Sequence, residues 1–262
     1  MPETITEKPS MAQPRRKASE PREITGISLI LPAKNEAQSI FDVASSVVSY
    51  CTTLEPLPYE VIIIDDGSTD DSQSVINRLQ ERYPGKIVSV ANPRNRGYGF
   101  AIRQGIIRSR YNLIFFTDAD GQFDIRDLSL LLPLIKCGVP DIVIGYRIDR
   151  KDPWIRLFLS GCYNILVRLL FGISVKDVDC AFKVFQKDIF DKINIRSKNF
   201  FINTEILAKA VFHGYRILEI GVDHLPRTAG RSTVNFRHVP MTIRELTRIW
   251  FEMRRLKKEE KA

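Results

Sequence analysis

Two carboxylates and an amide stand close together in the segment Thr117-Asp118-Ala119-Asp120-Gly121-Gln122, directly after an apolar run. Hard divalent cations take oxygen ligands, and Mg²⁺ is commonly bound by one or two carboxylates together with substrate phosphates. An open site of this kind predicts a cation that holds a diphosphate. Asp-x-Asp by itself is also a common turn, so the motif gains weight from its place after a strand-like run.

Two further polar segments follow apolar runs in the same way. Asp65-Asp66-Gly67-Ser68 comes after residues 61–64, and Leu31-Pro32-Ala33-Lys34-Asn35-Glu36 comes at the end of residues 27–31. A carboxylate in the Asp65 segment can accept hydrogen bonds from a base or a ribose hydroxyl, although helix capping explains the same residues. In open α/β sheets ligands bind outside the carboxyl ends of the strands. We therefore expect Asp65, Asp66, Asp118 and Asp120 to meet in one crevice.

The elements that must position these residues alternate along the chain. Short β-rich runs are separated by stretches with helical spacing, which predicts βαβ units, an α/β fold and a mainly parallel central sheet with helices on both faces. Several runs are apolar without alternation, as in strands buried on both sides. The predicted strands are residues 27–31, 61–64, 87–90, 113–117, 141–145, 182–185 and 216–222, and the later helices are 154–171, 204–212 and 239–258.

Size and composition are those of one catalytic domain. The 262 residues are 44% hydrophobic and 27% charged, which excludes a multi-span membrane protein and a wholly disordered chain. We predict a disordered tail over residues 1–23, a catalytic domain over 24–235 and a basic amphipathic helix over 236–262. The tail has no apolar stretch of the kind found in a signal peptide. The four cysteines match no metal or redox spacing, which favours reduced thiols in the cytosol.

The formal charge of +8 predicts a polyanionic partner, which could be nucleic acid, phosphate or an anionic membrane. Residues 154–173 are the most apolar segment, but Arg156, Asn164 and Arg168 make them a poor candidate for crossing a membrane. With Ser160, these three residues recur every fourth position and form one polar stripe. Either the stripe faces solvent, or the apolar flank contacts a lipid chain or the membrane interface. The basic helix at the C-terminus either lies on a membrane surface or docks on the core with a solvated basic face.

The donor-side motifs resemble those of glycosyltransferase family 2. The resemblance is carried by Pro32-Ala33-Lys34-Asn35-Glu36, Asp65-Asp66-Gly67-Ser68, Asn95-Arg96-Gly97-Tyr98-Gly99 and Asp118-Ala119-Asp120-Gly121-Gln122, and it runs from about residue 27 to 233. It implies the GT-A fold of nucleotide-diphospho-sugar transferases. The branch that it resembles most is that of the polyprenyl-phosphate sugar transferases, which includes the dolichol-phosphate mannosyltransferases.

The resemblance also implies roles for individual residues. It places Asp120 and Gln122 on the metal, which would be Mg²⁺ or Mn²⁺, and makes Asp120, Arg147 and Arg227 catalytic. Arg147 and Arg227 would face the donor diphosphate and the acceptor phosphate, because the guanidinium fork binds phosphate oxygens in pairs. Arg156 and Ser160 match the acceptor-phosphate pair of the family. The donor-binding residues would be Pro32, Lys34, Glu36, Ile63, Asp65, Asp118 and Ala119.

A general base is needed only for some acceptors. Asp177, Asp179 and Glu205 lie in segments similar to those of the family, and one of them could deprotonate a hydroxyl acceptor. The alternative is that they hold the acceptor loop by hydrogen bonds and ion pairs. A phosphate acceptor is already anionic near neutral pH and needs no base.

Two positions depart from the family pattern. Gly230-Arg231-Ser232-Thr233 stands where the dolichol-type enzymes commonly have Gly-Glu-Ser-Lys, and Tyr98 replaces a frequent lysine. The first departure bears on the acceptor side, where Arg231 could substitute for the missing lysine.

These observations predict an inverting, metal-dependent transferase that moves a sugar from a GDP- or UDP-hexose to a polyprenyl phosphate, peripherally on the cytoplasmic face of a membrane. One alternative is a family 2 enzyme that acts on a hydroxyl of a lipid or glycan. Another is a non-catalytic basic protein that binds a membrane surface or nucleic acid, although no nucleic acid is expected as a partner. No Gly-x-Gly-x-x-Gly follows the first strand, which disfavours a dinucleotide-dependent oxidoreductase. Oligomeric state and any separate membrane subunit stay open.

Overall fold

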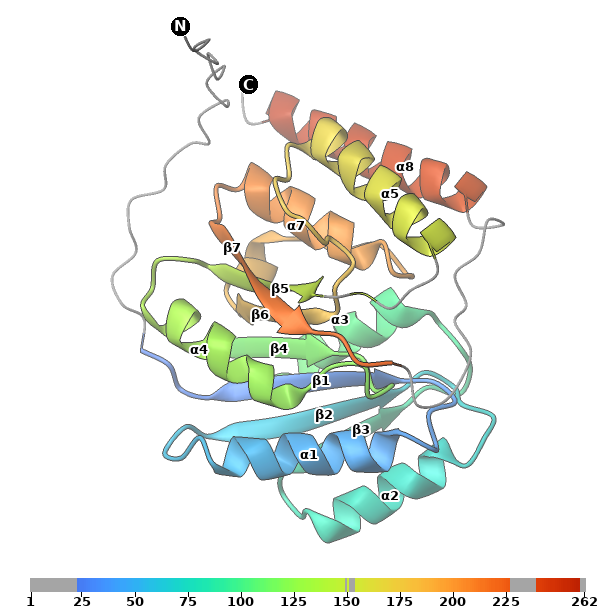
Figure 1. The fold of residues 1–262 in the computed structure, drawn as a ribbon, viewed down its shortest axis with the longest axis vertical. Helices are drawn as coiled ribbons and strands as arrows, with labels where there is room; N and C mark the ends of the chain where they lie inside the picture. Colours follow the sequence, from blue (N-terminus) through green and yellow to red (C-terminus); the bar gives the residue numbers. More distant parts are fainter. Residues whose placement is uncertain (1–22, 149, 151–153, 227–238, 260–262) are drawn as a thin grey trace, which may run out of the picture.

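A seven-stranded mixed sheet forms the centre of the computed structural model, which describes residues 23–148, 150, 154–226 and 239–259 (Figure 1). The strand order is β3-β2-β1-β4-β6-β5-β7. All neighbouring strands are parallel except β6, which runs antiparallel to both β4 and β5. The strands are β1 (Ile27–Ala33), β2 (Tyr59–Asp65), β3 (Ile87–Ala91), β4 (Leu113–Thr117), β5 (Ile142–Ile148), β6 (Phe182–Gln186) and β7 (Ile217–Asp223).

Helices cover both faces of this sheet, as the sequence predicts. Along β1, Leu29 and Leu31 belong to the core cluster under α1, α2 and α4, while Ile30 belongs to the cluster under α3, α7 and α8. Because both faces are covered, the strands are apolar without alternation. The helices are α1 (Ile40–Thr52), α2 (Ser72–Arg82), α3 (Tyr98–Arg108), the 3₁₀ turn η1 (Ile125–Asp127), α4 (Leu128–Lys136), α5 (Trp154–Phe171), α6 (Ile189–Lys192), α7 (Ile202–Phe212) and α8 (Val239–Glu259).

The reversed strand β6 is the feature that the hydrophobic pattern did not predict. A buried strand has the same apolar run in either direction, and the direction depends on how the chain returns to the sheet. On this strand Lys183 lies opposite Phe116 of β4 and has no exposed surface. Its Nζ donates hydrogen bonds to the carbonyl oxygens of Val178 and Cys180, in the loop that precedes the strand. The buried ammonium therefore anchors that loop at the edge of the sheet where β4 ends.

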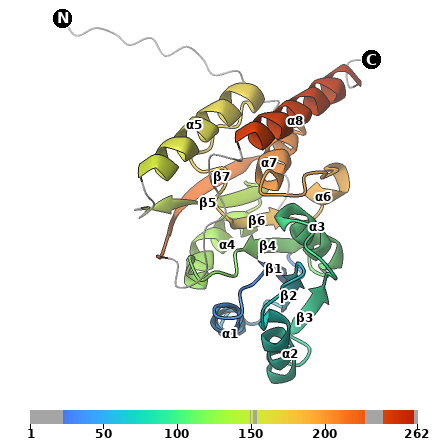
Figure 2. The ribbon, with the colours of Figure 1, turned by 90° about the vertical axis from the view of Figure 1, so that its right-hand side faces the viewer.

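Helices α5 and α8 pack side by side in an outer layer above α7 (Figures 1 and 2). Only Val167 of α5 is buried, and the helix exposes large apolar side chains, including Trp154 (75%), Phe158 (64%) and Leu169 (77%). With 18 residues and a mean hydropathy of 1.4, α5 is long and apolar enough to cross a membrane by length and composition alone. The sequence-based expectation that α5 does not cross a membrane stays a prediction, and Ser160 and Asn164 of this helix form hydrogen bonds with the domain.

Candidate active site

The loops that follow β1 and β2 are joined into one wall at the carboxyl edge of the sheet. Asn35 takes a left-handed backbone conformation (φ 56°), which asparagine tolerates better than most residues. Its N–H donates to Ser68 Oγ at 2.9 Å, and its Oδ1 accepts from the N–H of Thr69 at 2.8 Å. Ala33 and Asp65 end the two strands in register. Residues from the two predicted donor motifs are thus brought together at the carboxyl ends of β1 and β2.

Asp66 holds a third loop and does not line the crevice, which corrects the sequence-based expectation. Its carboxylate accepts hydrogen bonds from Asn92 Nδ2 and from the N–H groups of Arg96 and Gly97, at 2.7 to 2.9 Å. The loop approaches so closely that a Cβ on Gly67 would lie 2.4 Å from the carbonyl carbon of Arg94. Asp66 therefore fixes the entry into α3, while Asp65 accepts from the N–H of Ser68.

Asp118 and Asp120 crowd the turn after β4. Burial raises the pKa of Asp118 to about 7, and the negative charge of Asp120 adds to the effect. Tyr98, Arg147 and Lys183 act in the opposite direction, so all three lie close enough to influence this carboxyl. Residues of α3, β4, β5 and β6 therefore meet at one point.

Tyr98 places a neutral phenol beside this acid pair. Its hydroxyl is buried next to the Asp118 carboxylate, whose pKa it lowers as a hydrogen-bond donor. Burial raises the pKa of Tyr98 well above its usual value, and the neighbouring Asp118 raises it further, so the group stays a neutral donor. A tyrosine here offers a hydrogen bond to the site without the positive charge of a lysine.

The acid pair fits a divalent cation. Burial and the charge of Asp120 raise the pKa of Asp118, and a cation that neutralises this pair removes the penalty. Asp120 Oδ1 accepts from the N–H of Gln122, and the chain after β7 closes over this turn, with Leu225 N–H bonded to the Gln122 carbonyl at 2.9 Å. Among the described residues no group of three or more His, Cys, Asp or Glu is arranged to hold a metal. The geometry matches an open site that a substrate diphosphate would complete.

Arg147 lies near the end of β5, where it forms an ion pair with Asp177. Its Nε and Nη2 bind the Asp177 carboxylate at 2.6 and 2.8 Å, and its side chain is 10% exposed. Burial works against the charged guanidinium, but the hydrogen bonds and charge of Asp177 outweigh it, and the pKa of Arg147 is raised. Asp177 in turn has a lowered pKa, because Arg147 outweighs the effect of burial. Asp177 is thereby a positioning residue for Arg147, which leaves Nη1 of the fork for a phosphate.

Asp179 is the member of the proposed base set with the properties of a base. Burial raises its pKa to about 6, and the charge of Asp177 contributes. Its Oδ1 is buried and has no hydrogen-bond partner within the described chain. A carboxylate that ionises near neutral pH and keeps an unused oxygen is suited to accept a proton.

The chain matches known proteins at the level of family and fold. The profile of "Glycosyl transferase family 2" matches residues 28–194. This protein belongs to glycosyltransferase family 2. The chain is 29% identical over 92% of its length, and over 71% of the relative, to a dodecaprenyl-phosphate galacturonate synthase of Rhizobium johnstonii. It is 30% identical, over 81% of its length and 61% of the relative, to an undecaprenyl-phosphate 4-deoxy-4-formamido-L-arabinose transferase of Pseudomonas syringae pv. syringae.

A third relative is a polyprenol monophosphomannose synthase of Mycolicibacterium smegmatis, 25% identical over 79% of this chain and 80% of the relative. The chain spans 61% to 64% of the length of several other relatives. Among solved structures, glucosyl-3-phosphoglycerate synthase of Mycobacterium tuberculosis, in complex with Mn²⁺, UDP and glucosyl-3-phosphoglycerate, matches with a TM-score of 0.64 and 18% identity. That match covers 87% of this chain and 80% of the other. The likeness establishes the GT-A fold of the glycosyltransferase.

Ile63 and Arg227 differ from the other residues that the sequence predicts for the site of this glycosyltransferase. Ile63 has no exposed surface and packs in the core under α1, so it cannot touch a nucleoside as predicted and only supports the site from below. Arg227 lies outside the described residues, as do Arg231, Ser232 and Thr233. The other donor residues, Pro32, Lys34, Glu36, Asp65, Asp118 and Ala119, all lie at the carboxyl ends of β1, β2 and β4.

The polar stripe of α5 faces the transferase domain. Asn164 donates to the carbonyl of Lys176 at 2.9 Å and accepts from the N–H of Val178 at 3.2 Å, so it holds the loop that carries Asp177 and Asp179. Ser160 Oγ accepts from Arg150 Nη1 at 2.9 Å. Arg150 is a basic residue of this site that sequence reasoning missed, and its only signal was the spacing Arg147-x-x-Arg150. Ser160, which is one residue of the predicted acceptor-phosphate pair, therefore contacts Arg150, and Asn164 one turn further along α5 binds the loop of Asp177 and Asp179.

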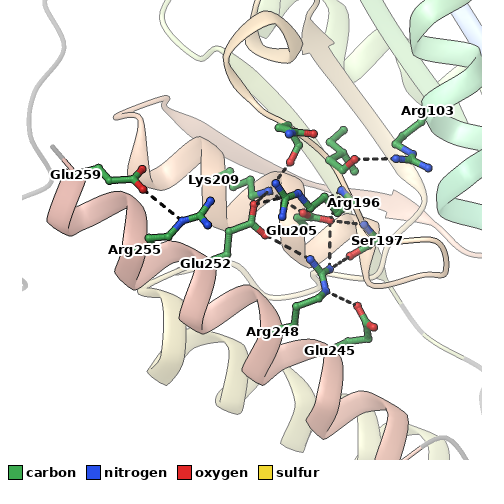
Figure 3. A network of polar contacts seen from close by, with 12 residues as sticks. Arg103, Arg196, Ser197, Glu205, Lys209, Glu245, Arg248, Glu252, Arg255 and Glu259 are labelled. Carbon is green, nitrogen blue, oxygen red and sulfur yellow. Dashed lines mark hydrogen bonds and ion pairs between the residues drawn. The ribbon is translucent and has the colours of Figure 1, made fainter.

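Glu205 lies in an ion-pair network between α7 and α8, not in the crevice (Figure 3). Its carboxylate accepts from Lys209 Nζ at 2.7 Å and from the N–H groups of Arg196 and Ser197. Arg248 of α8 lies 3.6 Å away. Burial alone would raise the pKa of Glu205, but Lys209 and these donors outweigh it and the pKa is lowered. The structure thus contradicts a role as general base, because a fully hydrogen-bonded, low-pKa carboxylate is a poor proton acceptor.

The substitution Glu205→Gln is expected to destabilise the domain by about 3 kcal/mol, because it removes one of the two carboxylates that pair with the buried Lys209. Chemical denaturation of the folded variant measures this directly. Glu259→Gln is the matched control, since Glu259 pairs with Arg255 in an exposed position and should contribute little. If both substitutions cost the same, the network of Figure 3 does not stabilise the contact between α7 and α8.

Mn²⁺ binding is expected to weaken by about tenfold between pH 8 and pH 6, because protonation of Asp118 removes a negative charge from the site. The pKa of this group is raised to about 7, so the carboxylate is charged above that pH and neutral below it. Titration of free Mn²⁺ by electron paramagnetic resonance checks the slope. In Asp118→Asn the pH dependence over this range should disappear; an unchanged slope in that variant would assign the proton elsewhere.

Proposed function

We propose that this enzyme transfers a sugar from a nucleotide-sugar donor to a polyprenyl phosphate at the cytoplasmic surface of a membrane. The observation that carries the proposal is the junction of two features. The acidic turn after β4 fits a cation, and Arg147 acts on it from β5. Asp177, which orients Arg147, lies in a loop that Asn164 of α5 binds, and α5 exposes its apolar side chains. The names of relatives that act on dodecaprenyl, undecaprenyl or polyprenol phosphates support the same acceptor class.

On the donor side, Asp65 and Glu36 are placed to accept hydrogen bonds from a nucleoside, and Lys34 stands exposed beside them. Asp120 and Gln122 would hold Mg²⁺ or Mn²⁺ against the diphosphate. That cation, when bound, would neutralise charge on the departing nucleoside diphosphate. Arg147, oriented by Asp177, would place its remaining N–H groups on the same oxygens, and its rigidity lowers the cost of reorganisation during transfer.

On the acceptor side, Arg156, Ser160 and Arg150 would receive a phosphate at the edge of α5. A phosphate oxygen is anionic near neutral pH, so it attacks the anomeric carbon without a base, and attack from the face opposite the diphosphate inverts the configuration. Asp179 favours a second candidate function, which is transfer of the sugar to a hydroxyl acceptor. A hydroxyl acceptor needs a base, and the raised pKa and unused oxygen of Asp179 fit that role.

The membrane proposal comes from the exposed side of α5 and α8. Trp154, Phe158, Leu169, Ile243 and Phe251 are large apolar residues that solvent reaches on these two helices. Basic residues stand among them on α8, which suits an anionic lipid surface: Arg244, Arg254, Arg255, Lys257 and Lys258. Because Asn164 and Ser160 bind the domain, α5 would lie in the interface with its apolar flank in the lipid. The four free cysteines fit a reducing compartment.

A transfer assay with Mn²⁺, a panel of UDP- and GDP-sugars and a short polyprenyl phosphate tests the function. Wild type should form lipid-linked sugar, and Asp120→Ala should form none because it loses a metal ligand. Asp179→Asn separates the two acceptor classes. It should retain transfer to a phosphate acceptor, whereas a hydroxyl acceptor would lose about a hundredfold or more. Full activity of Asp120→Ala would rule out the assigned metal site.

Membrane binding should depend on α5. Phe158→Ser combined with Leu169→Ser is expected to weaken association with vesicles of phosphatidylcholine and phosphatidylglycerol by about tenfold or more, since each exposed side chain loses its apolar transfer energy. Co-sedimentation measures the bound fraction. Ile107→Ser on α3 is the matched control, because Ile107 is 80% exposed but lies on another surface. Equal binding by all three proteins would remove α5 from the membrane contact.

A further inference from the structure

A second cavity, of about 390 Å³, lies on the outer side of α3, away from the acid pair. Its lining includes four cations and no acidic residue: Arg94, Asn95, Arg96, Phe100, Arg103 and Lys198. None of the four cations forms an ion pair with another residue of the described chain, whereas Arg147, Lys209 and Arg248 elsewhere are all paired. Like charges gathered around one space repel each other, and an anion in that space relieves the repulsion.

The geometry of α3 separates this cavity from the donor crevice. With about 100° between successive residues of a helix, Ile102 and Gly105 face the sheet, and a Cβ on Gly105 would meet Ile30. Tyr98 lies on that side and reaches Asp118. Phe100 and Arg103 fall on the opposite side, towards Ile107, which is 80% exposed. A ligand between Phe100 and Lys198 therefore occupies a different surface from one bound to Asp118 and Asp120.

The walls of the cavity are tied to each other by backbone hydrogen bonds. The carbonyl of Lys198 accepts from the N–H of Gly99 at 2.7 Å and from that of Phe100 at 3.2 Å. A Cβ on Gly97 would lie 2.4 Å from the same carbonyl oxygen, so only glycine permits this approach. On the far side of the loop, Arg248 of α8 donates to Ser197 Oγ at 2.7 Å (Figure 3). Hydrogen bonds thus hold the loop at Ser197 and Lys198 against both α3 and α8.

The guanidinium groups of Arg96 and Arg103 are held in place by the ring of Phe100. Arg96 stacks on the ring of Phe100, with Cζ 3.5 Å from the centroid, and Arg103 lies 5.5 Å from the same ring. Arg103 Nη1 donates to the carbonyl of Ile195 at 2.9 Å, while its Nε is buried and has no partner in the described chain. A buried N–H that is left without an acceptor costs free energy, so the Arg103 guanidinium is incompletely satisfied within the described chain. The nearest acid that contacts this loop, Asp66, is already saturated by three N–H donors.

We infer that this cavity is a second anion site, which takes a phosphate or diphosphate group independently of the metal-dependent donor site. Planar guanidinium groups recognise phosphate oxygens in pairs, and two arginines fixed against one aromatic ring present such donors with little loss of conformational freedom. The phosphate could belong to a soluble compound or to the headgroup of a lipid. The site goes beyond the proposed sugar transfer, and its test does not need that activity.

The probe is inorganic pyrophosphate, titrated by calorimetry into the full chain at low salt with EDTA present. Without a divalent cation the acidic turn after β4 repels this anion, and the variants below separate binding in the basic cavity from binding at the proposed acceptor side around Arg150 and Arg156. Arg103→Gln and Lys198→Gln should each weaken binding by about tenfold, because each removes a charged donor. Lys198 is exposed, so its substitution does not threaten the fold. Arg108→Gln, at the exposed end of the same helix, is the matched control and should bind as wild type does.

Vesicles of phosphatidylcholine with and without phosphatidic acid distinguish a lipid headgroup from a soluble compound as the source of the phosphate. Binding to phosphatidic acid that Lys198→Gln weakens and pyrophosphate displaces assigns the site to a lipid phosphate. Binding of pyrophosphate with no such vesicle effect assigns it to a soluble phosphate. The inference is overturned if both glutamine variants bind pyrophosphate as tightly as Arg108→Gln does. It is also overturned if Lys198→Gln weakens Mn²⁺-dependent binding of UDP and GDP equally, since the cavity would then be part of the donor site.

Discussion

The crowding of Asp118 and Asp120 at the end of β4 is the constraint on which the active site depends. Burial disfavours the charged form of Asp118, and the negative charge of Asp120 disfavours it further. The fold tolerates them because positive groups stand around them: Arg147 on β5 and Lys183 on β6 both act on Asp118. In the proposed function, a divalent cation together with a diphosphate would complete this balance.

The reversed strand β6 is what brings these positive groups to the acid pair. It enters the sheet between β4 and β5, and the loop before it carries Asp177 and Asp179. Lys183 anchors one side of the loop from below, and Asn164 of α5 holds it from above. One short segment therefore orients Arg147, supplies a carboxyl that titrates near neutral pH, and contacts the helix proposed to meet the lipid.

The two outer helices differ in how they are attached. Helix α8 is fixed to α7 by a dense network around Glu205 and Lys209 (Figure 3), and buries Leu246 and Ile249 in the core. Helix α5 buries little and is held chiefly by polar groups, which is the reverse of an ordinary surface helix. Such an arrangement leaves its apolar side without a partner in the domain. A lipid surface would cover that side, and the phosphate of a lipid acceptor would then lie beside Ser160 and Arg150.

The sequence by itself determined the elements, the family and the donor-side motifs. Apolar runs and helical spacing located every strand of the sheet to within three residues at each end, because the pattern of hydrophobic burial is local in the sequence. Asp118, Asp120 and Gln122 were recognisable for the same reason, since a cation motif lies within one turn. Only the tertiary structure decided the direction of β6, the side of α5 that faces the domain, and the partners of each charge. From sequence, Asp66 was expected in the crevice and Ile63 at the nucleoside, but Asp66 binds a loop and Ile63 is enclosed in the core. For Glu205 the sequence left a base and an ion-pairing role open, and the structure shows the ion pair with Lys209. Arg150 and the cations around Phe100 were not identified, because their neighbours are distant in sequence. Charge pairing depends on distances between such neighbours, and the chain acquires those distances only when it folds.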